Sequence, residues 1–156
     1  MIKSIPKAGT DQKKLEQRWT VPLIRAGYTV IPNAILYRQK ALGIDSVDLN
    51  IILQIASHWW SPESLPFPSK KRLAAAVNIS ESAVRKRLAA LEKGGLLTRI
   101  SRPAKHGGND TNLYDLGPLI KEATPYAQDM LQEIKVKTAA KIAKLSKKGK
   151  PQLKVV

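Results

Sequence analysis

The stretch SKKRLAAAVNISESAVRKRLAALEKGGLLTRI, residues 69–100, decides the fold of this chain. Its pattern predicts a short helix over residues 70–77, a tight turn at Asn78-Ile79 and a longer helix over residues 81–93. Gly94-Gly95 should end the second helix, because glycine readily adopts the positive φ found at many helix C-termini. Two helices joined by a short turn are therefore expected at the centre of the chain.

Each predicted helix has a capping residue and an apolar face. Ser69 and Ser80 stand directly before the helices, where a serine hydroxyl can accept a hydrogen bond from a free N–H group of the first turn. Val84, Leu88 and Leu91 recur at i, i+4 and i+7, so they should form the buried stripe of the second helix. The other face of that helix is left for a partner.

A hairpin and a last long helix should follow. Residues 96–101 and 111–116 predict two strands around the glycine-rich segment RPAKHGGND. Thr124 and Pro125 have the character of an N-cap and a first helical residue, and the helix should run to about Leu145. Its narrow apolar stripe consists of Leu131, Ile134, Thr138, Ile142 and Leu145. We expect this stripe to pair with a second copy, although it could instead pack on its own domain.

The segment before the central stretch is predicted to begin a scaffold. Residues 28–31 suit a short strand or an extended segment. Asn33 can cap a helix over residues 34–41, which Leu42-Gly43 should stop.

A helix over residues 47–60, capped by Asp45 or Ser46, is the best candidate for the centre of the core. Its apolar residues cover nearly the whole circumference, as in a helix buried on all sides. Trp59 and Trp60 at its end are expected to pack in the core, with stacking on nucleic-acid bases as the other interpretation.

The charge of the chain favours a polyanionic partner. Among 156 residues, 27 are Lys or Arg and 12 are Asp or Glu, giving a formal net charge of +15. Each phosphate that a cation neutralises releases counterions, so such a balance suits DNA or RNA. A merely soluble basic protein is the other interpretation. The hydrophobic fraction of 43% is enough for a real core.

No set of catalytic, cofactor-binding or metal-binding residues is predicted. The absence of cysteine excludes disulfides and thiolate zinc sites. His58 should be a satisfied histidine in the core or at a helix end, and His106 stands alone. No phosphate-binding glycine loop and no membrane-spanning run occur. We therefore expect a cytoplasmic protein that is not an enzyme and not a membrane protein.

Double-stranded DNA is the expected partner, because the major groove admits one α-helix. Ser82 and Arg85 are predicted to contact bases, with Lys86 and Ala89 flanking them. Glu81 either accepts a hydrogen bond from cytosine or neutralises the helix end, and we favour the second. Residues before and within the first helix should bind phosphates, as should the hairpin. The complete predicted set is Ser69, Lys70, Lys71, Ser80, Ser82, Arg85, Lys86, Ala89, Arg99, Arg102, Lys105 and His106.

The central stretch resembles the winged helix-turn-helix DNA-binding proteins of bacteria. The shared features are Pro68-Ser69, Leu73-Ala74, Ile79-Ser80, Val84-Arg85 and the run from Leu91 to Leu97, with one additional glycine. The resemblance implies that Ser80, Ser82 and Arg85 correspond to DNA-contacting positions. It also implies a bacterial, nucleoid-associated protein. The upstream segment GYTVIPNAIL, residues 27–36, resembles plasmid and phage replication proteins and related regulators.

The sequence thus predicts a mainly α fold with a small β-hairpin wing, a winged helix-turn-helix plus a long C-terminal helix. We expect a flexible basic arm (1–25), a DNA-binding domain (26–117), a dimerisation helix (118–146) and a basic disordered tail (147–156). The leading function is a homodimeric transcriptional regulator that binds specific double-stranded DNA. The alternatives are a plasmid or phage replication or partition initiator at iterated sites, and a winged-helix adaptor for protein or RNA.

Overall fold

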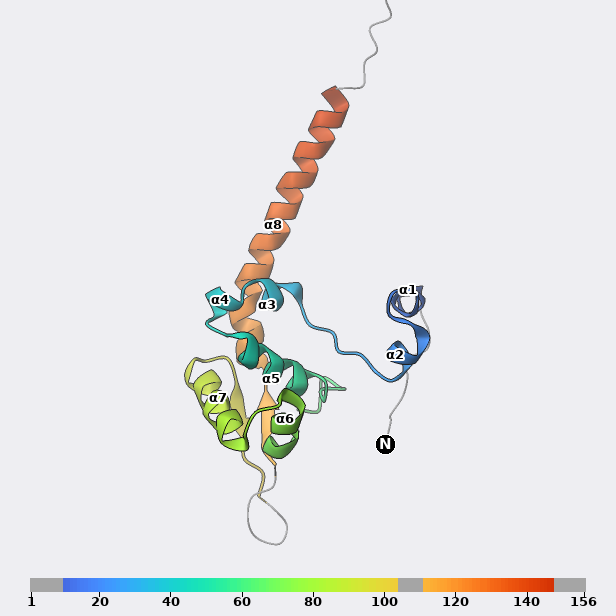
Figure 1. The fold of residues 1–156 in the computed structure, drawn as a ribbon. Helices are drawn as coiled ribbons and strands as arrows, with labels where there is room; N and C mark the ends of the chain where they lie inside the picture. The colour runs from blue at the N-terminus through green and yellow to red at the C-terminus, as the bar shows by residue number, and fades with distance from the viewer. Residues whose placement is uncertain (1–9, 104–110, 148–156) are drawn as a thin grey trace, which may run out of the picture.

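The structure, a computed structural model, describes residues 10–103 and 111–147 (Figure 1). Within these ranges helices dominate, and two short strands form one antiparallel sheet. The predicted fold, a mainly α winged helix with a hairpin and a long C-terminal helix, is confirmed. The elements are α1 (Thr10–Trp19), α2 (Val21–Arg25), α3 (Asn33–Tyr37), α4 (Gln39–Leu42), α5 (Ser46–Ala56), α6 (Lys70–Val77), α7 (Glu81–Lys93), β1 (Thr98–Ile100), β2 (Leu113–Asp115) and α8 (Gly117–Lys147).

Helix α5 is the centre of the core, as its all-round apolar character predicted. Ile51, Ile52 and Ile55 are at most 1% exposed, and α6 and α7 both pack against the helix. Of the two capping candidates, Asp45 is the residue used. Its carboxylate accepts from the backbone N–H of Val47 and Asp48 at 2.9 Å, while the Asp48 side chain accepts from the Asp45 N–H. This reciprocal cap fixes where α5 begins.

The predicted end of this helix was wrong. Helix α5 stops at Ala56, because the next N–H groups, of His58 and Trp59, bond three residues back instead of four. Trp60 lies outside the core with 78% of its surface exposed, whereas Trp59 is partly buried against the core. His58 is a satisfied helix-end histidine, with Nδ1 2.8 Å from the carbonyl oxygen of Gln54.

The segment before α5 also differs in detail from its prediction. Residues 28–31 are extended and form no strand. One helix was expected over residues 34–41, but Arg38 divides it into α3 and α4. Pro32 occupies the N-cap position, so Asn33 is the first helical residue and not the cap. Gly43 ends α4 with φ of 72°, as predicted.

Helix α7 passes into the wing through a two-glycine C-terminus. The N–H of Gly95 bonds to the carbonyl of Glu92 at 3.1 Å, and the N–H of Leu96 bonds to that of Leu91 at 2.9 Å. This pair of bonds is the Schellman arrangement, which needs a left-handed residue, and Gly95 has φ of 72°. The additional glycine therefore closes α7 and aims the chain into β1. The strands pair antiparallel, with Arg99 opposite Tyr114.

Helix α8 begins eight residues before the predicted start. The Asp115 carboxylate accepts from the N–H of Gly117 at 2.8 Å, so the helix begins at Gly117. Pro125 lies inside the helix and not at its first position. Thr124 is not an N-cap, because its hydroxyl donates to the carbonyl of Ile120 within the helix at 2.6 Å. A proline interior to a helix is tolerated here at the cost of one backbone bond.

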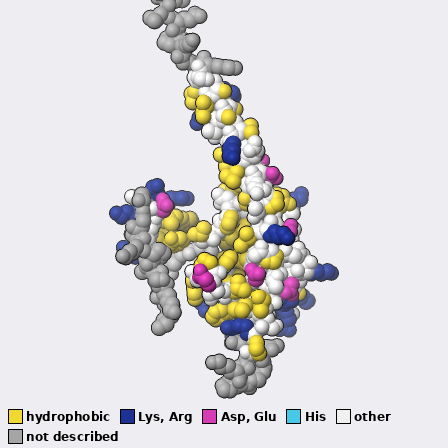
Figure 2. Space-filling view, turned by 180° about the vertical axis from the view of Figure 1, so that it is seen from behind, with side chains coloured by type: hydrophobic (Ala, Val, Ile, Leu, Met, Phe, Trp, Pro, Cys, Tyr) yellow, Lys and Arg dark blue, Asp and Glu magenta, His cyan; other side chains and the backbone are white. Residues whose placement is uncertain are grey.

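The two halves of α8 have different surroundings. Leu119 and Ala123 are buried in the core, and this half packs against α3. Every residue from 131 to 146 is exposed, and this half projects beyond the globular body (Figure 1). Hydrophobic side chains are visible along the projecting half in Figure 2. The wing lies at the opposite end of the molecule (Figure 1).

The first two helices form a unit of their own. Helices α1 and α2 pack on each other, with Ile24 and Gln12 buried between them. An extended segment connects them to the body, from which they stand apart in Figure 1. Residues 10–25 of the expected arm therefore contain two helices.

Candidate nucleic-acid interface

The helix-turn-helix unit has the bounds and the caps that the sequence predicted. The hydroxyl of Ser69 accepts from the N–H of Arg72, and that of Ser80 accepts from the N–H of Ala83, both at 3.1 Å. Asn78, with φ of 58°, supplies the left-handed turn between the helices. A capped N-terminus still leaves backbone N–H groups directed outward, which is where helices bind anions.

Helix α7 has one buried and one exposed face. Val84, Leu88 and Leu91 are buried as predicted. The predicted contacts on the other face are all exposed, namely Ser80, Glu81, Ser82, Arg85, Lys86 and Ala89. Among the ion pairs found in the described residues, none involves Arg85 or Lys86. Both cations are therefore presented to solvent on the exposed face of α7.

An open groove of about 410 Å³ lies between the start of α6 and the base of the wing. The structure brings three predicted phosphate ligands together on its wall, namely Ser69, Lys70 and Lys71. Glu81 from α7 also lines the groove. Three further polar residues come from the wing, Ser101, Thr111 and Asn112. Sequence reasoning missed these three, although they flank the glycine-rich tip that it identified.

The wing is tied to the start of α6. The N–H of Tyr114 in β2 donates to the carbonyl of Pro66 at 2.9 Å. The guanidinium of Arg102 lies 4.6 Å from the ring centroid of Phe67 and donates to the carbonyl and hydroxyl oxygens of Thr111 at 2.8 and 2.7 Å. Arg102 therefore braces the base of the wing.

Arg99 has a carboxylate partner inside the molecule. Its Nε and Nη2 donate to Glu92 Oε2 at 2.9 and 2.5 Å, and its backbone N–H donates to Oε1 at 3.0 Å. These bonds connect β1 to the last turn of α7. The predicted contacts Lys105 and His106 lie outside the described residues.

Acidification should weaken the connection between Glu92 and Arg99. The Arg99 guanidinium, followed by the Arg99 N–H, lowers the pKa of Glu92 below its ordinary value of 4.5. A depressed carboxylate pKa contributes stability that is present above 4.5 and is lost as pH falls through the folded value. We expect Glu92→Gln to reduce the free energy of unfolding at pH 7, and we expect this difference to shrink as the pH falls below 4.5. Urea titrations across that range measure this, and a constant difference would contradict it.

Arg87 is a structural residue that the sequence did not reveal. It lies on α7 between the predicted contacts, but Nη1 points to α5, where it pairs with Asp45 and lies 3.1 Å from Asp48. The same guanidinium, by hydrogen bonding, is the first cause of the lowered pKa of Asp45. The arginine holds the middle of α7 against the capped N-terminal end of the central helix.

The helix-turn-helix and the hairpin together form a winged helix, and residues 31–135 match the DnaD N-terminal domain family. The chain belongs to the DnaD N-terminal domain family. The match spans α3 to the middle of α8, and so includes the complete helix-turn-helix and wing. Helices α1 and α2 and most of the projecting half of α8 lie outside it. The predicted kinship with bacterial winged-helix DNA-binding proteins is confirmed.

Solved structures similar to this DnaD-type chain include several described as regulators. A possible transcriptional regulator from Methanosarcina mazei Go1 is 20% identical over 66% of this chain and 84% of its own, with a TM-score of 0.39. YusO from Bacillus subtilis is 15% identical over 90% and 99%, with a TM-score of 0.42. The multiple antibiotic-resistance repressor MarR from Listeria monocytogenes is 17% identical over 92% and 95%, with a TM-score of 0.39. No curated protein matches the sequence.

Two other features are missing from the described part of this DnaD-type chain. It contains no group of three His, Asp or Glu side chains that could hold a metal ion. None of its helices is both long and apolar enough to cross a bilayer.

Proposed function

We propose that the chain binds double-stranded DNA, with α7 in the major groove and the wing on the adjacent backbone. The observation that carries the proposal is the exposed face of α7, where Ser82, Arg85 and Lys86 stand free of the described ion pairs. An arginine there can bond guanine O6 and N7, and short serines permit close approach. Membership in the DnaD N-terminal domain family and the net charge of +15 support the same partner.

The groove beside α6 supplies the backbone contacts in this proposal. Lys70 and Lys71 line it beside the capped N-terminus of α6, where N–H groups and ammonium groups attract the same anion. Residues 26–117 would then act as the DNA-binding domain. Lys105 and His106, which lie outside the described residues, remain predicted contacts. Arg99 and Arg102 form hydrogen bonds within the molecule that support the wing.

The biological role has two candidates within this function. The family match supports a role in DNA replication, the alternative that residues 27–36 also suggested. A transcriptional regulator is the other candidate. Footprinting on the native locus separates them, because iterated direct repeats indicate replication or partition and a single promoter palindrome indicates repression. A protein or RNA adaptor would protect no duplex site at all.

Salt dependence tests the backbone contacts. Binding to random duplex DNA should weaken linearly in log affinity against log salt, with a slope of about −0.9 for each neutralised phosphate. We expect Lys71→Ala to reduce the magnitude of that slope by about 1. Fluorescence anisotropy between low and physiological salt measures it.

Lys40→Ala is the matched control for that measurement. Lys40 is an exposed lysine on α4, which lies away from the wing in Figure 1. Its replacement removes the same charge and should leave the slope unchanged. Equal effects of the two variants would indicate a diffuse field in place of a defined groove, and salt-independent binding would contradict the proposed function.

A further inference from the structure

The apolar stripe of α8 is symmetric in sequence and lies on the projecting half of the helix, where every residue is exposed. Its members are Leu131, Ile134, Thr138, Ile142 and Leu145, and the four apolar ones are between 57% and 62% exposed. The spacings of three, four, four and three residues, and the order Leu, Ile, Thr, Ile, Leu, are the same from either end. Leu131 and Ile142 are eleven residues apart, as are Ile134 and Leu145, and this period keeps the stripe nearly straight along the helix.

We propose that this stripe is the docking surface for α8 of a second copy, which lies antiparallel to the first. This proposal adds a geometry to the homodimer that the sequence led us to expect. It rests on the proposed DNA-binding function only for the biological purpose of that dimer. A two-fold axis at Thr138 then places Leu131 against the partner's Leu145 and Ile134 against the partner's Ile142. Such an interface is isologous, because the same residues meet in both directions.

The charges along α8 favour the antiparallel direction over the parallel one. From its start to residue 133 the helix carries three acidic residues, Glu122, Asp129 and Glu133, and one lysine, Lys121. Every charged residue after Glu133 in the helix is a lysine. A parallel pair would set these lysines side by side at each level. An antiparallel pair with its axis at Thr138 sets Lys141, Lys144 and Lys147 of one helix near the level of Asp129 and Glu133 of the other.

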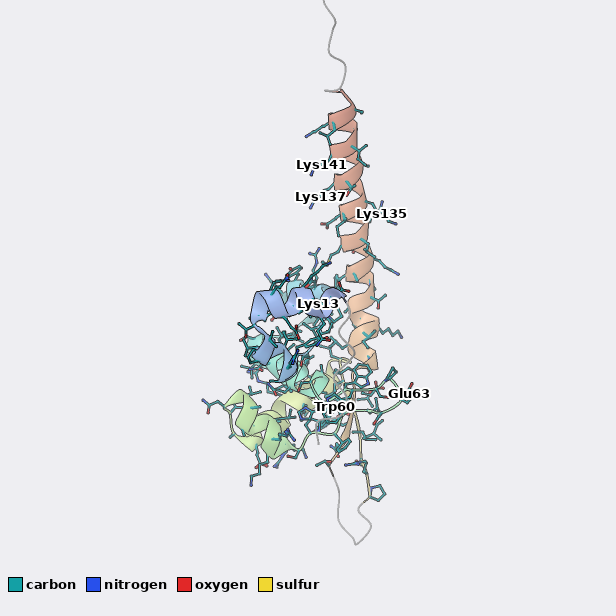
Figure 3. The ribbon with its side chains drawn as sticks, turned by 90° about the vertical axis from the view of Figure 1, so that its right-hand side faces the viewer. Lys13, Trp60, Glu63, Lys135, Lys137 and Lys141 are labelled. Carbon is teal, nitrogen blue, oxygen red and sulfur yellow. The ribbon has the colours of Figure 1, made fainter. Side chains whose placement is uncertain are left out.

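The lysines beside the stripe indicate that two copies should associate only weakly through α8. Lys137 and Lys141 lie on one side of α8 and Lys135 on the other (Figure 3). In the pair each edge therefore carries lysines from both copies, which repel one another. The apolar contact of two 15-residue segments is also small beside the roughly 1,000 Å² of a stable interface. We expect a dimer that depends on concentration, in which the globular bodies lie at opposite ends of the helix pair.

Disulfide trapping tests the arrangement, because the chain has no cysteine of its own. Leu131→Cys and Leu145→Cys are prepared separately in the full chain, oxidised alone and as an equimolar mixture, and separated on a non-reducing gel. The antiparallel pair predicts several-fold more covalent dimer in the mixture than in either variant alone. Preferential cross-linking of Leu131→Cys to itself would indicate a parallel pair and overturn the proposal.

Two further variants provide the reference rates. Thr138→Cys lies on the axis and should cross-link with itself. Val136→Cys, 59% exposed like the stripe but on the far side of the helix, should not. Equal rates for these two would mean random collision and would overturn the proposal. The proposal would also be overturned if Thr138→Cys cross-linked to Leu23→Cys more readily than to a second Thr138→Cys chain. That result would indicate that the stripe packs against α2.

Random-duplex binding by the reduced variants keeps the two proposals separate. Normal DNA binding without specific cross-links would refute the proposed antiparallel pair and would be consistent with the proposed function. Specific cross-links in a chain that does not bind DNA would support the antiparallel pair and refute the proposed function.

Discussion

Leu88→Ala is expected to lower the free energy of unfolding by about 2–5 kcal/mol. Leu88 is 0% exposed in the middle of α7, where it packs in the same core as the central helix. The substitution removes three methylene-equivalent groups and leaves a cavity that rigid neighbours cannot fill. Urea denaturation should show a lower midpoint at an unchanged slope. A loss below about 1 kcal/mol would contradict the close packing of α7 on the core.

Leu23→Ala is the matched control. The same side chain is removed, but Leu23 on α2 is 59% exposed and lies in the separate N-terminal unit. Its replacement should change the free energy of unfolding by about 0.5 kcal/mol or less. The comparison isolates burial from the chemistry of the leucine side chain.

Arg85→Ala should cost about 1–3 kcal/mol of affinity for the specific DNA site and little for random duplex DNA. The exposed guanidinium stands one turn into α7, where it can bond both acceptors of a guanine edge. Quantitative gel shift on a selected site and on a scrambled site measures both affinities. Equal losses on the two would make Arg85 a phosphate contact and refute its assignment as a base contact.

Arg87→Ala tests whether position on α7 alone explains such an effect. Arg87 is two residues away, but it faces Asp45 and Asp48 on the central helix. We expect its loss to reduce thermal stability while the ratio of specific to random affinity stays unchanged. A changed ratio with an unchanged melting temperature would assign Arg87 to the DNA interface instead.

The sequence predicted the elements whose signals are local. Helices α6 and α7 have the predicted bounds, because a serine cap, an apolar stripe and a left-handed turn residue all act within a few positions. The exposed face of α7 followed from the same periodicity. The wing strands were found from their turn, although the structure makes each only three residues long.

The features that were predicted wrongly or missed depend on contacts between residues far apart in the sequence, or on two local signals that compete. Thr124-Pro125 had the character of a helix start, but the carboxylate of Asp115 starts α8 earlier and the burial of Leu119 and Ala123 holds that turn in place. Trp60 was expected in the core because α5 was extended by four residues, whereas tightened bonds after Ala56 turn the chain outward. The partners of Arg87 are about forty residues away in the chain, beyond any short-range pattern.

The separation of α8 into a seated half and a projecting half has a consequence for hydrogen exchange. Residues 131–146 are exposed on all sides in the single chain, so little besides local helix propensity protects their amides. The amides around Leu119 and Ala123 should instead exchange only when the core opens. Slow exchange in the projecting half would therefore report directly that something has covered it. The exchange rates of the amides in residues 131–146 would therefore report assembly, and they can be followed one by one as the protein concentration is raised or DNA is added.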